Sequence, residues 1–176
     1  MIFVTVGTQL PFDRLIRTVD DWAGAHPEVE VFAQVGPSEM RAAHIETVPF
    51  VAPDEADRRF RQADLIVSHA GMGSIITALK YKKPILILPR VAAQGEHRND
   101  HQMATAKWLG VRRGITVAWT EQEVSRYLEG ELQLSQTGEI SDSADPQFIN
   151  NLRSAIMGEV EPRLAPKKLA FGWLRH

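Results

Sequence analysis

Residues 68–74, SHAGMGS, have the residue types that a phosphate-binding turn needs. They follow an apolar run. A helix that begins at Gly73 or Ser74 would direct its free backbone N–H groups and about half a positive charge beyond the strand. Gly71 and Gly73 have no Cβ, so phosphate oxygens can approach the backbone closely. Ser74 can cap the helix and offer a hydroxyl. The segment predicts a diphosphate site; a tight turn that uses glycine only for its geometry is the open alternative.

A second polar segment, QGEHRNDHQ at residues 94–102, follows the apolar run PILILPR and belongs to the same edge of a parallel sheet. His97 and His101 are four residues apart and would share one helix face, with Glu96 and Asp100 beside them, which permits a metal site. No third ligand of recognised spacing accompanies the two histidines. We therefore favour binding of a sugar or ribose over a metal, and a solvated helix face is the remaining alternative.

Two common nucleotide-binding motifs do not occur in the sequence. The dinucleotide fingerprint follows the first strand and has a third glycine, whereas here the first strand is followed by GTQLPF. The Walker motif G-x-x-x-x-G-K-[ST] is found nowhere in the chain. The glycine turn therefore belongs to a different kind of phosphate site.

The composition fits a globular domain with a hydrophobic core, because 44% of the 176 residues are hydrophobic and 24% are charged. A net charge of −2 argues against a general nucleic-acid binder. The absence of cysteine excludes a disulfide framework and a thiolate metal site. No apolar run approaches the roughly 18 residues of a membrane span. The opening MIFVTVG has no basic stretch of the signal-peptide type. We expect a cytoplasmic protein.

The elements that must position these segments alternate along the chain. Apolar, β-branched runs predict strands at residues 1–6, 29–35, 44–51, 64–69, 84–89 and 113–118. Helical spacing predicts helices from Pro11, from Pro53 and from the glycine turn, and at residues 97–110 and 120–128, the last with a Thr120–Glu123 capping box. Strands without polar alternation suit a sheet covered on both faces. The sequence predicts an α/β fold with a single Rossmann-like, doubly wound parallel sheet.

The expected domain organisation is a Rossmann-like domain at residues 1–130, a polar loop at 131–144, a helix at 145–158 and a tail at 159–176. The tail is basic and apolar together. It suits a membrane interface, but prolines and a glycine would interrupt a long amphipathic helix. Packing on this domain and docking on a partner chain remain open alternatives.

The segments SHAGMGS, KPILILPR and GEHRNDHQMATA, in this order, resemble the C-terminal domain of glycosyltransferase family 28. The opening VTVGTQLPFDRLI resembles the first strand and loop of that family, and the resemblance covers about residues 1–128. It implies the nucleotide-sugar-binding half of a GT-B fold. Within that family, the chain resembles the small subunits of split transferases of N-glycan and bacterial exopolysaccharide synthesis.

The resemblance also implies where a UDP-sugar donor would lie. The diphosphate would sit between the loop at residues 7–8 and the turn at residues 69–74, the backbone at residues 50–51 would meet the uracil, and residues 100–102 would contact the sugar. The expected donor-binding residues are Gly7, Thr8, Phe50, Val51, His69, Gly71, Met72, Gly73, Ser74, Glu96, Asp100, His101 and Gln102.

One position departs from the family pattern. Many members have a glutamate that accepts both ribose hydroxyls in the helix after the glycine turn, and this chain has Thr77 there. A hydroxyl cannot replace a bidentate carboxylate. Either Glu96 takes over the ribose, or the donor is held differently. Glu96 and His69, the latter as an imidazolium beside the leaving diphosphate, are also the catalytic candidates in this chain.

The resemblance implies a catalytic, UDP-sugar-binding subunit of a heteromeric, inverting glycosyltransferase that transfers a sugar of the GlcNAc or glucuronic acid type to a lipid-linked acceptor. Neither a metal nor another cofactor is expected. The general base and the acceptor site would come from a membrane-anchored partner subunit, which would also hold this chain at the cytoplasmic face of a membrane. The alternatives are a small glycosyltransferase that acts alone and a nucleotide-sugar-binding regulatory protein without turnover.

Overall fold

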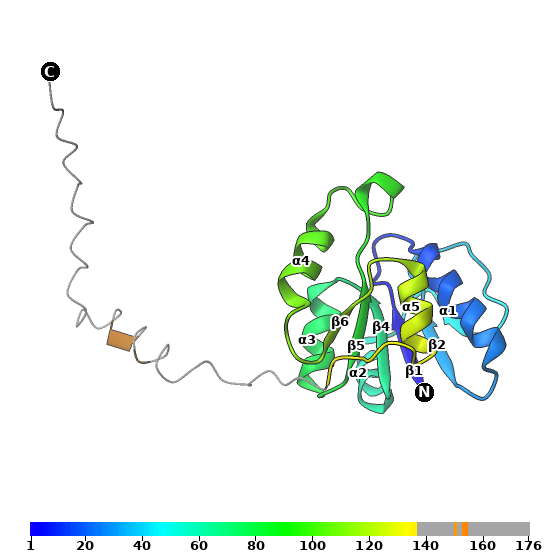
Figure 1. Cartoon of the computed structure of the whole chain (residues 1–176), viewed down its shortest axis with the longest axis horizontal. Helices are drawn as coiled ribbons and strands as arrows, with labels where there is room; N and C mark the ends of the chain where they lie inside the picture. Colours follow the sequence, from blue (N-terminus) through cyan, green and yellow to red (C-terminus); the bar gives the residue numbers. More distant parts are fainter. Residues whose placement is uncertain (137–149, 151–152, 155–176) are drawn as a thin grey trace, which may run out of the picture. The chain divides into compact units, whose positions relative to one another are not determined.

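The computed structural model describes residues 1–136, 150, 153 and 154. Within residues 1–136, six parallel strands form one sheet in the order β3-β2-β1-β4-β5-β6 (Figure 1). They are β1 Ile2–Thr5, β2 Val31–Gln34, β3 Glu46–Val48, β4 Leu65–His69, β5 Ile85–Leu88 and β6 Ile115–Val117. The chain adds β2 on one side of β1 and β4 on the other. This reversal places a crevice at the carboxyl ends of β1 and β4, where open α/β sheets bind their ligands.

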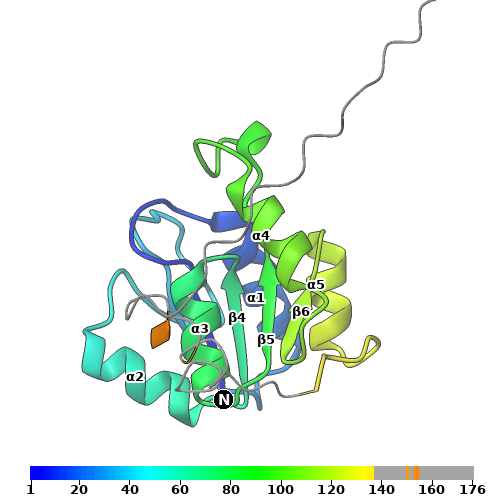
Figure 2. The same ribbon diagram turned by 90° about the vertical axis from the view of Figure 1, so that its left-hand side faces the viewer.

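Helices cover both faces of the sheet. The helices α1 Asp13–Ala25 and α5 Glu121–Leu128 lie on one face, and α2 Pro53–Gln62, α3 Met72–Lys80 and α4 His101–Leu109 lie on the other (Figures 1 and 2). Alternate strand residues therefore enter different clusters: Val4 packs under α1 and α5, and Phe3 packs against α2 and α3. Every residue of β1, β2 and β5 is buried, as expected for strands with two covered faces.

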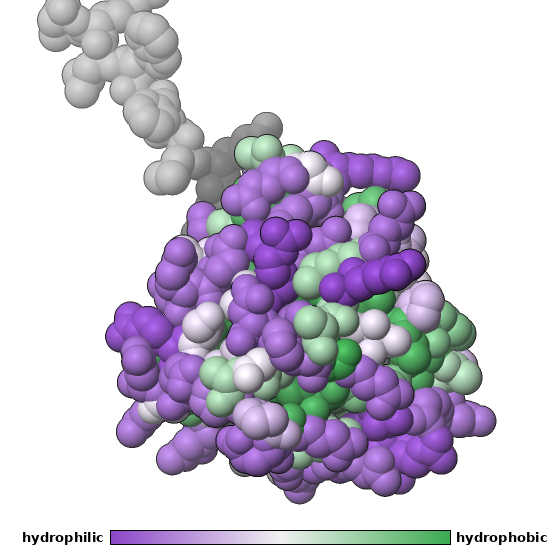
Figure 3. Space-filling view, turned by 90° about the vertical axis from the view of Figure 1, so that its right-hand side faces the viewer, coloured by the Kyte–Doolittle hydropathy of each residue, from purple (hydrophilic) through white to green (hydrophobic). Residues whose placement is uncertain are grey.

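The outer surface is mainly hydrophilic on the side that lies at the right of Figure 1, with smaller apolar areas between the polar side chains (Figure 3). The buried stripe of α1 explains this distribution. Its apolar residues recur at helical spacing and face the sheet: Leu15, Ile16, Val19, Trp22 and Ala23. Among the described residues, no helix has the length and apolar character that crossing a bilayer requires.

The predicted fold class is confirmed, but three local predictions are wrong. The helix expected at residues 97–110 begins only at His101, because residues 96–100 form bends after a short 3-10 helix, η1 Ala92–Gln94. Pro11 does not occupy the first helical position, since α1 is capped by Phe12 and begins at Asp13. The strand expected at residues 44–51 is reduced to β3 Glu46–Val48.

Contacts divide the chain into two units, Met1–Ile140 and Ser141–His176. Residues 131–136, the start of the predicted polar loop, contain neither helix nor strand. Residues 150, 153 and 154, inside the predicted helix at 145–158, are helical. The rest of that helix and the tail at residues 159–176 lie outside the described residues.

Candidate functional site

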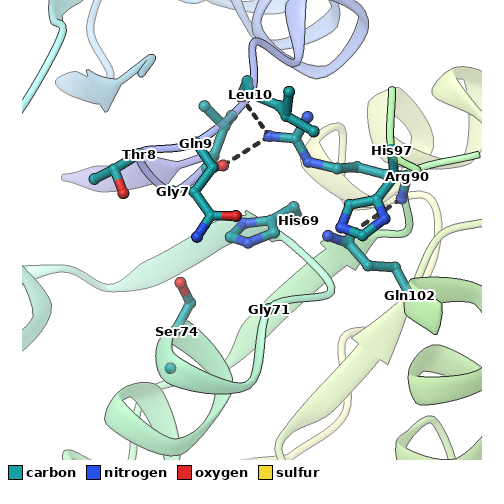
Figure 4. Close-up of a pocket in the computed structure, with 12 residues that line it drawn as sticks. Gly7, Thr8, Gln9, Leu10, His69, Gly71, Ser74, Arg90, His97 and Gln102 are labelled. Carbon is teal, nitrogen blue, oxygen red and sulfur yellow. Dashed lines mark hydrogen bonds between the residues drawn. The ribbon is translucent and has the colours of Figure 1, made fainter. Parts of the chain in front are cut away.

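A cavity of about 480 Å³ opens at the carboxyl edge of the sheet (Figure 4). Its size is within the range of about 300–1,000 Å³ that is usual for small-molecule sites. The loop after β1, the end of β4, the start of α3 and the loop after β5 all contribute to it. The lining residues are Val6, Gly7, Thr8, Gln9, Leu10, His69, Gly71, Gly73, Ser74, Arg90, His97 and Gln102.

The N-terminus of α3 faces this cavity. Gly71 is the N-cap residue and no side chain caps the helix, so the first backbone N–H groups of α3 remain available to a ligand. A Cβ on Gly73 would meet no atom within 4 Å, which leaves open space for a phosphate at the helix start. The prediction that Ser74 caps the helix is wrong, because Ser74 is already the third helical residue.

His69 explains the other glycines of the site. Its imidazole lies between the Gly7 turn and the Gly71 turn: a Cβ on Gly71 would come 2.2 Å from Nε2, and a Cβ on Gly7 would come 3.3 Å from the same atom. Gly7 also has a φ of +76°, which favours glycine. Of the two explanations for the glycine turn, local geometry therefore applies to Gly71, whereas at Gly73 the space is open and close approach of a ligand stays a prediction.

The His69 ring is held by the strand beneath it. Its Nδ1 lies 3.4 Å from the carbonyl oxygen of Thr5 and 3.3 Å from the Ser68 hydroxyl, which donates to the same carbonyl. Burial, helped by the positive charge of Arg90, lowers the pKa of His69 to about 4. His69 is therefore neutral at pH 7 in the empty site, and the imidazolium expected beside a diphosphate requires its pKa to rise when the ligand binds.

Arg90 follows β5 by two residues, after Pro89. Its side chain lies against the loop that follows β1. This side chain is buried and donates to the carbonyl oxygens of Val6 and Leu10, each at 2.8 Å (Figure 4). It also donates to the carbonyl oxygen of Pro11 at 2.5 Å. Gln102 ties the neighbouring segments together, because its Oε1 accepts from the backbone N–H groups of Ala70 and Arg90. The Gln102 amide nitrogen is then the part of this side chain that can donate to a ligand.

Glu96 is engaged away from the cavity. Its carboxylate accepts from Arg14 Nε at 2.7 Å, from Arg14 Nη2 at 2.9 Å and from the backbone N–H of Val91 at 2.9 Å. The side chain of Glu96 is 11% exposed and that of Arg14 is 14% exposed, so the ion pair between them is largely shielded from water. Thr77 is also occupied, since its hydroxyl donates to the Gly73 carbonyl. The geometry therefore favours a structural role for Glu96 over the expected ribose contact.

The other expected residues divide between the cavity and its surroundings. Gly7, Thr8, His69, Gly71, Gly73, Ser74 and Gln102 line it, and Phe50, Val51, Met72, Glu96, Asp100 and His101 do not. Phe50 is 62% exposed, and the Val51 N–H donates to Gln34 Oε1. Asp100 accepts from the backbone N–H of Ala92, and His101 begins α4.

Five lining residues were not predicted: Val6, Gln9, Leu10, Arg90 and His97. Gln9 had a local signal, since it lies in the polar loop directly after the first strand. His97 was singled out for a metal but not for a donor. It lies in the bend before α4, so it does not share a helix face with His101. Within the described residues, no three His, Cys, Asp or Glu side chains gather closely enough to hold a metal ion.

Comparison with known proteins identifies the family of this fold and cavity. The model of the glycosyltransferase family 28 C-terminal domain matches residues 1–150. The chain belongs to this family. The match includes all the strands and the whole lining of the cavity, so the resemblance of the three sequence segments is confirmed.

Curated relatives include three UDP-N-acetylglucosamine transferase subunits named ALG13. The protein from Yarrowia lipolytica is 28% identical over 134 residues, which cover 67% of this chain and 64% of the relative. The protein from Candida albicans is 24% identical over 128 residues, covering 73% of this chain and 39% of the relative. The chain thus spans less than two thirds of the length of these relatives.

Solved structures show the same fold. The solution structure of ALG13 is 19% identical, covers 89% of this chain and 96% of its own, and superposes with a TM-score of 0.55. A UDP-glucose:anthocyanidin 3-O-glucosyltransferase in complex with UDP is 14% identical, covers 92% of this chain and 36% of its own, and gives a TM-score of 0.54. The Rossmann-like half of a glycosyltransferase fold, expected from the resemblance, is therefore confirmed.

Proposed function

We propose that this chain is the catalytic, UDP-sugar-binding subunit of a two-part inverting glycosyltransferase. The observation that carries the proposal is the uncapped N-terminus of α3, which faces a 480 Å³ cavity with open space at Gly73. Membership of glycosyltransferase family 28 and the names of the curated relatives support a nucleotide-sugar donor.

The cavity suits departure of a diphosphate. Transfer of the sugar to an acceptor hydroxyl breaks the bond between the anomeric carbon and the β-phosphate oxygen, and UDP gains negative charge. The first N–H groups of α3 and the loop at residues 7–9 can accept that charge in a preorganised site. Because a helix terminus and Arg90 are available, we propose that a metal is not required for this step.

The remaining parts of the proposed reaction belong to a second chain. The acceptor is proposed to be a lipid-linked saccharide, and the sugar to be of the GlcNAc or glucuronic acid type. A membrane-anchored partner would bring the acceptor site and the general base, and would hold this chain at the membrane. The curated relatives, which are named as subunits, support a divided enzyme.

Substitution at the helix start tests donor binding. In Gly73→Val, a branched side chain fills the space at the start of α3, and we expect UDP to bind at least tenfold more weakly by calorimetry while circular dichroism stays unchanged. The matched control is Lys80→Val, which places the same side chain at the exposed end of the same helix. Unchanged UDP affinity in Gly73→Val would remove the diphosphate from this site.

Two rival functions have distinct signatures. A transferase that acts alone would glycosylate an acceptor without any partner. A regulatory protein would bind UDP tightly and show no transfer even with the partner present. Sugar transfer that requires both chains separates the proposal from both rivals.

A further inference from the structure

Arg90 is a buried cation that lines the cavity; it is the last residue of the KPILILPR segment, but the expected donor-binding residues do not include it. The residue is 2% exposed. Its Nη1 donates to Pro11 O at 2.5 Å and to Glu96 O at 3.1 Å, and its Nη2 donates to Val6 O and Leu10 O, each at 2.8 Å. One guanidinium therefore fixes the loop after β1 against the loop after β5.

The charge of Arg90 is not balanced by an ion pair. Among the described residues, no carboxylate forms an ion pair with its guanidinium; the Glu96 backbone oxygen accepts a hydrogen bond, and the Glu96 carboxylate acts on it only at longer range, where it opposes the larger effect of burial, which lowers the pKa of Arg90. The Glu96 carboxylate is instead paired with Arg14. Burial of a cation is costly unless a counter-charge is near, and four carbonyl dipoles offset that cost only in part.

An anion in the cavity would supply a closer counter-charge than the Glu96 carboxylate, which does not offset the burial of Arg90. Arg90 lines the cavity beside His69 and His97. Neither histidine can carry the negative charge that would balance the guanidinium. The influence of Arg90 already reaches across this space, because its charge contributes to the lowered pKa of His69. A phosphate that binds at the start of α3 would enter the same field.

We propose that Arg90 is a positioning residue of the donor site: it holds the loop at residues 6–11 in its binding conformation, and its unpaired charge favours a ligand with more than one phosphate. This deepens, and rests on, the proposed donor-binding function. A neutral side chain at position 90 that donates hydrogen bonds would fix the loop, but it would not discriminate between ligands by their charge.

The test compares uridine, UMP and UDP by calorimetry in the full chain. Arg90→Gln removes the charge, and we expect the affinity for UDP to fall about tenfold or more, that for UMP to fall less and that for uridine least. Arg90→Lys keeps the charge but cannot reach four carbonyls, so all affinities should fall while the preference for UDP over uridine persists. The control Arg112→Gln removes an exposed charge from the turn after α4, outside the cavity lining, and should change none of them.

Several results would overturn the proposal. Equal loss of uridine and UDP affinity in Arg90→Gln would leave Arg90 with a structural role alone. If Arg90→Gln does not fold, Arg90→Lys decides, because loss of the preference with the charge retained contradicts a charge effect. The pKa of His69, followed by NMR, should rise in Arg90→Gln and stay low in Arg90→Lys.

A measurement on the unaltered chain separates this inference from the proposed function. Inorganic pyrophosphate should shift the NMR signal of the Arg90 guanidinium when it binds. If UDP fails to bind but pyrophosphate produces that shift, the donor assignment fails and the role of Arg90 in anion binding stands. Pyrophosphate binding that leaves the Arg90 signal unchanged contradicts the role of Arg90.

Discussion

His69 shows how one buried side chain constrains its neighbours in the site. The imidazole occupies the space where Gly71 would have a Cβ, at 2.2 Å, and Gly7 borders its other side. A methyl group at Gly71 must therefore displace the ring or the turn. The same ring lines the cavity at the start of α3, so its position and its protonation state both bear on ligand binding.

The protonation of His69 gives a prediction with a defined sign. Since its pKa is about 4 when folded and about 6.5 when unfolded, unfolding takes up a proton between these values. The free energy of unfolding should decrease as the pH falls from 6.5 toward 4. A bound diphosphate favours the imidazolium, so UDP should raise the pKa of His69.

NMR titration of the His69 ring, with and without UDP, measures both values. His69→Gln identifies the signal and serves as the control, because it should remove that titration alone. A ring that titrates near pH 6.5 in the empty protein would contradict the burial that the structure shows.

The individual residues of the site were only partly predictable. The glycines of residues 69–74 predicted a phosphate-binding turn, and the family resemblance predicted Gln102 as a donor-binding residue. Arg90 was missed because its role depends on carbonyls of residues 6, 10 and 11, about 80 positions earlier in the chain. Glu96 was assigned to the ribose because its ion pair with Arg14, 82 positions away, leaves no local signal.

At the scale of elements, most of the strands and helices could be predicted from the sequence. Apolar runs marked the strands that are covered on both faces, such as β1, β2 and β5, whereas β3 at the sheet edge is the polar and partly exposed sequence ETV. The N-cap of α5 was also predictable: Thr120 accepts from the Glu123 N–H, although the Glu123 carboxylate reaches the N–H of Trp119 instead of the expected Thr120 N–H. The start of α4 could not be predicted, because a polar segment can form either a helix or a loop, and tertiary contacts decide which of the two forms.

The ion pair between Arg14 of α1 and Glu96 of the loop after β5 gives a prediction at the scale of elements. Glu96→Gln weakens the pairing with Arg14, and we expect the free energy of unfolding to decrease by about 1–3 kcal/mol. Because the change acts through the loop, the affinities for UDP and for pyrophosphate should fall by similar factors. Urea denaturation and calorimetry measure the two effects.

Glu131→Gln is the matched control for that experiment. Glu131 also pairs with an arginine, Arg126, but both side chains are more than half exposed. An exposed pair is worth only about 0–1 kcal/mol, so this variant should change stability little. A loss of UDP affinity in Glu96→Gln without a loss of pyrophosphate affinity would restore the ribose role for Glu96.

For the whole molecule, the two-chain proposal makes the cavity one wall of a reaction site. The described lining offers backbone N–H groups, the imidazoles of His69 and His97 and a buried arginine, which together suit an anionic leaving group. His69, with a pKa of about 4, is poorly matched to accepting a proton from an acceptor hydroxyl at pH 7. His97 is the other imidazole at the cavity, and the two-chain proposal assigns the base to the partner subunit instead.

Reconstitution with a membrane-anchored partner tests this division. Because this chain provides the donor cavity and the partner is proposed to provide the base and the acceptor site, co-expression should give a stable heterodimer. That heterodimer should transfer sugar from a UDP-sugar to a lipid-linked acceptor, and neither chain alone should do so. Gly73→Val should abolish transfer while the heterodimer still forms, which separates donor binding from assembly. Efficient transfer by the purified 176-residue chain alone would overturn the two-chain proposal and favour the enzyme that acts by itself.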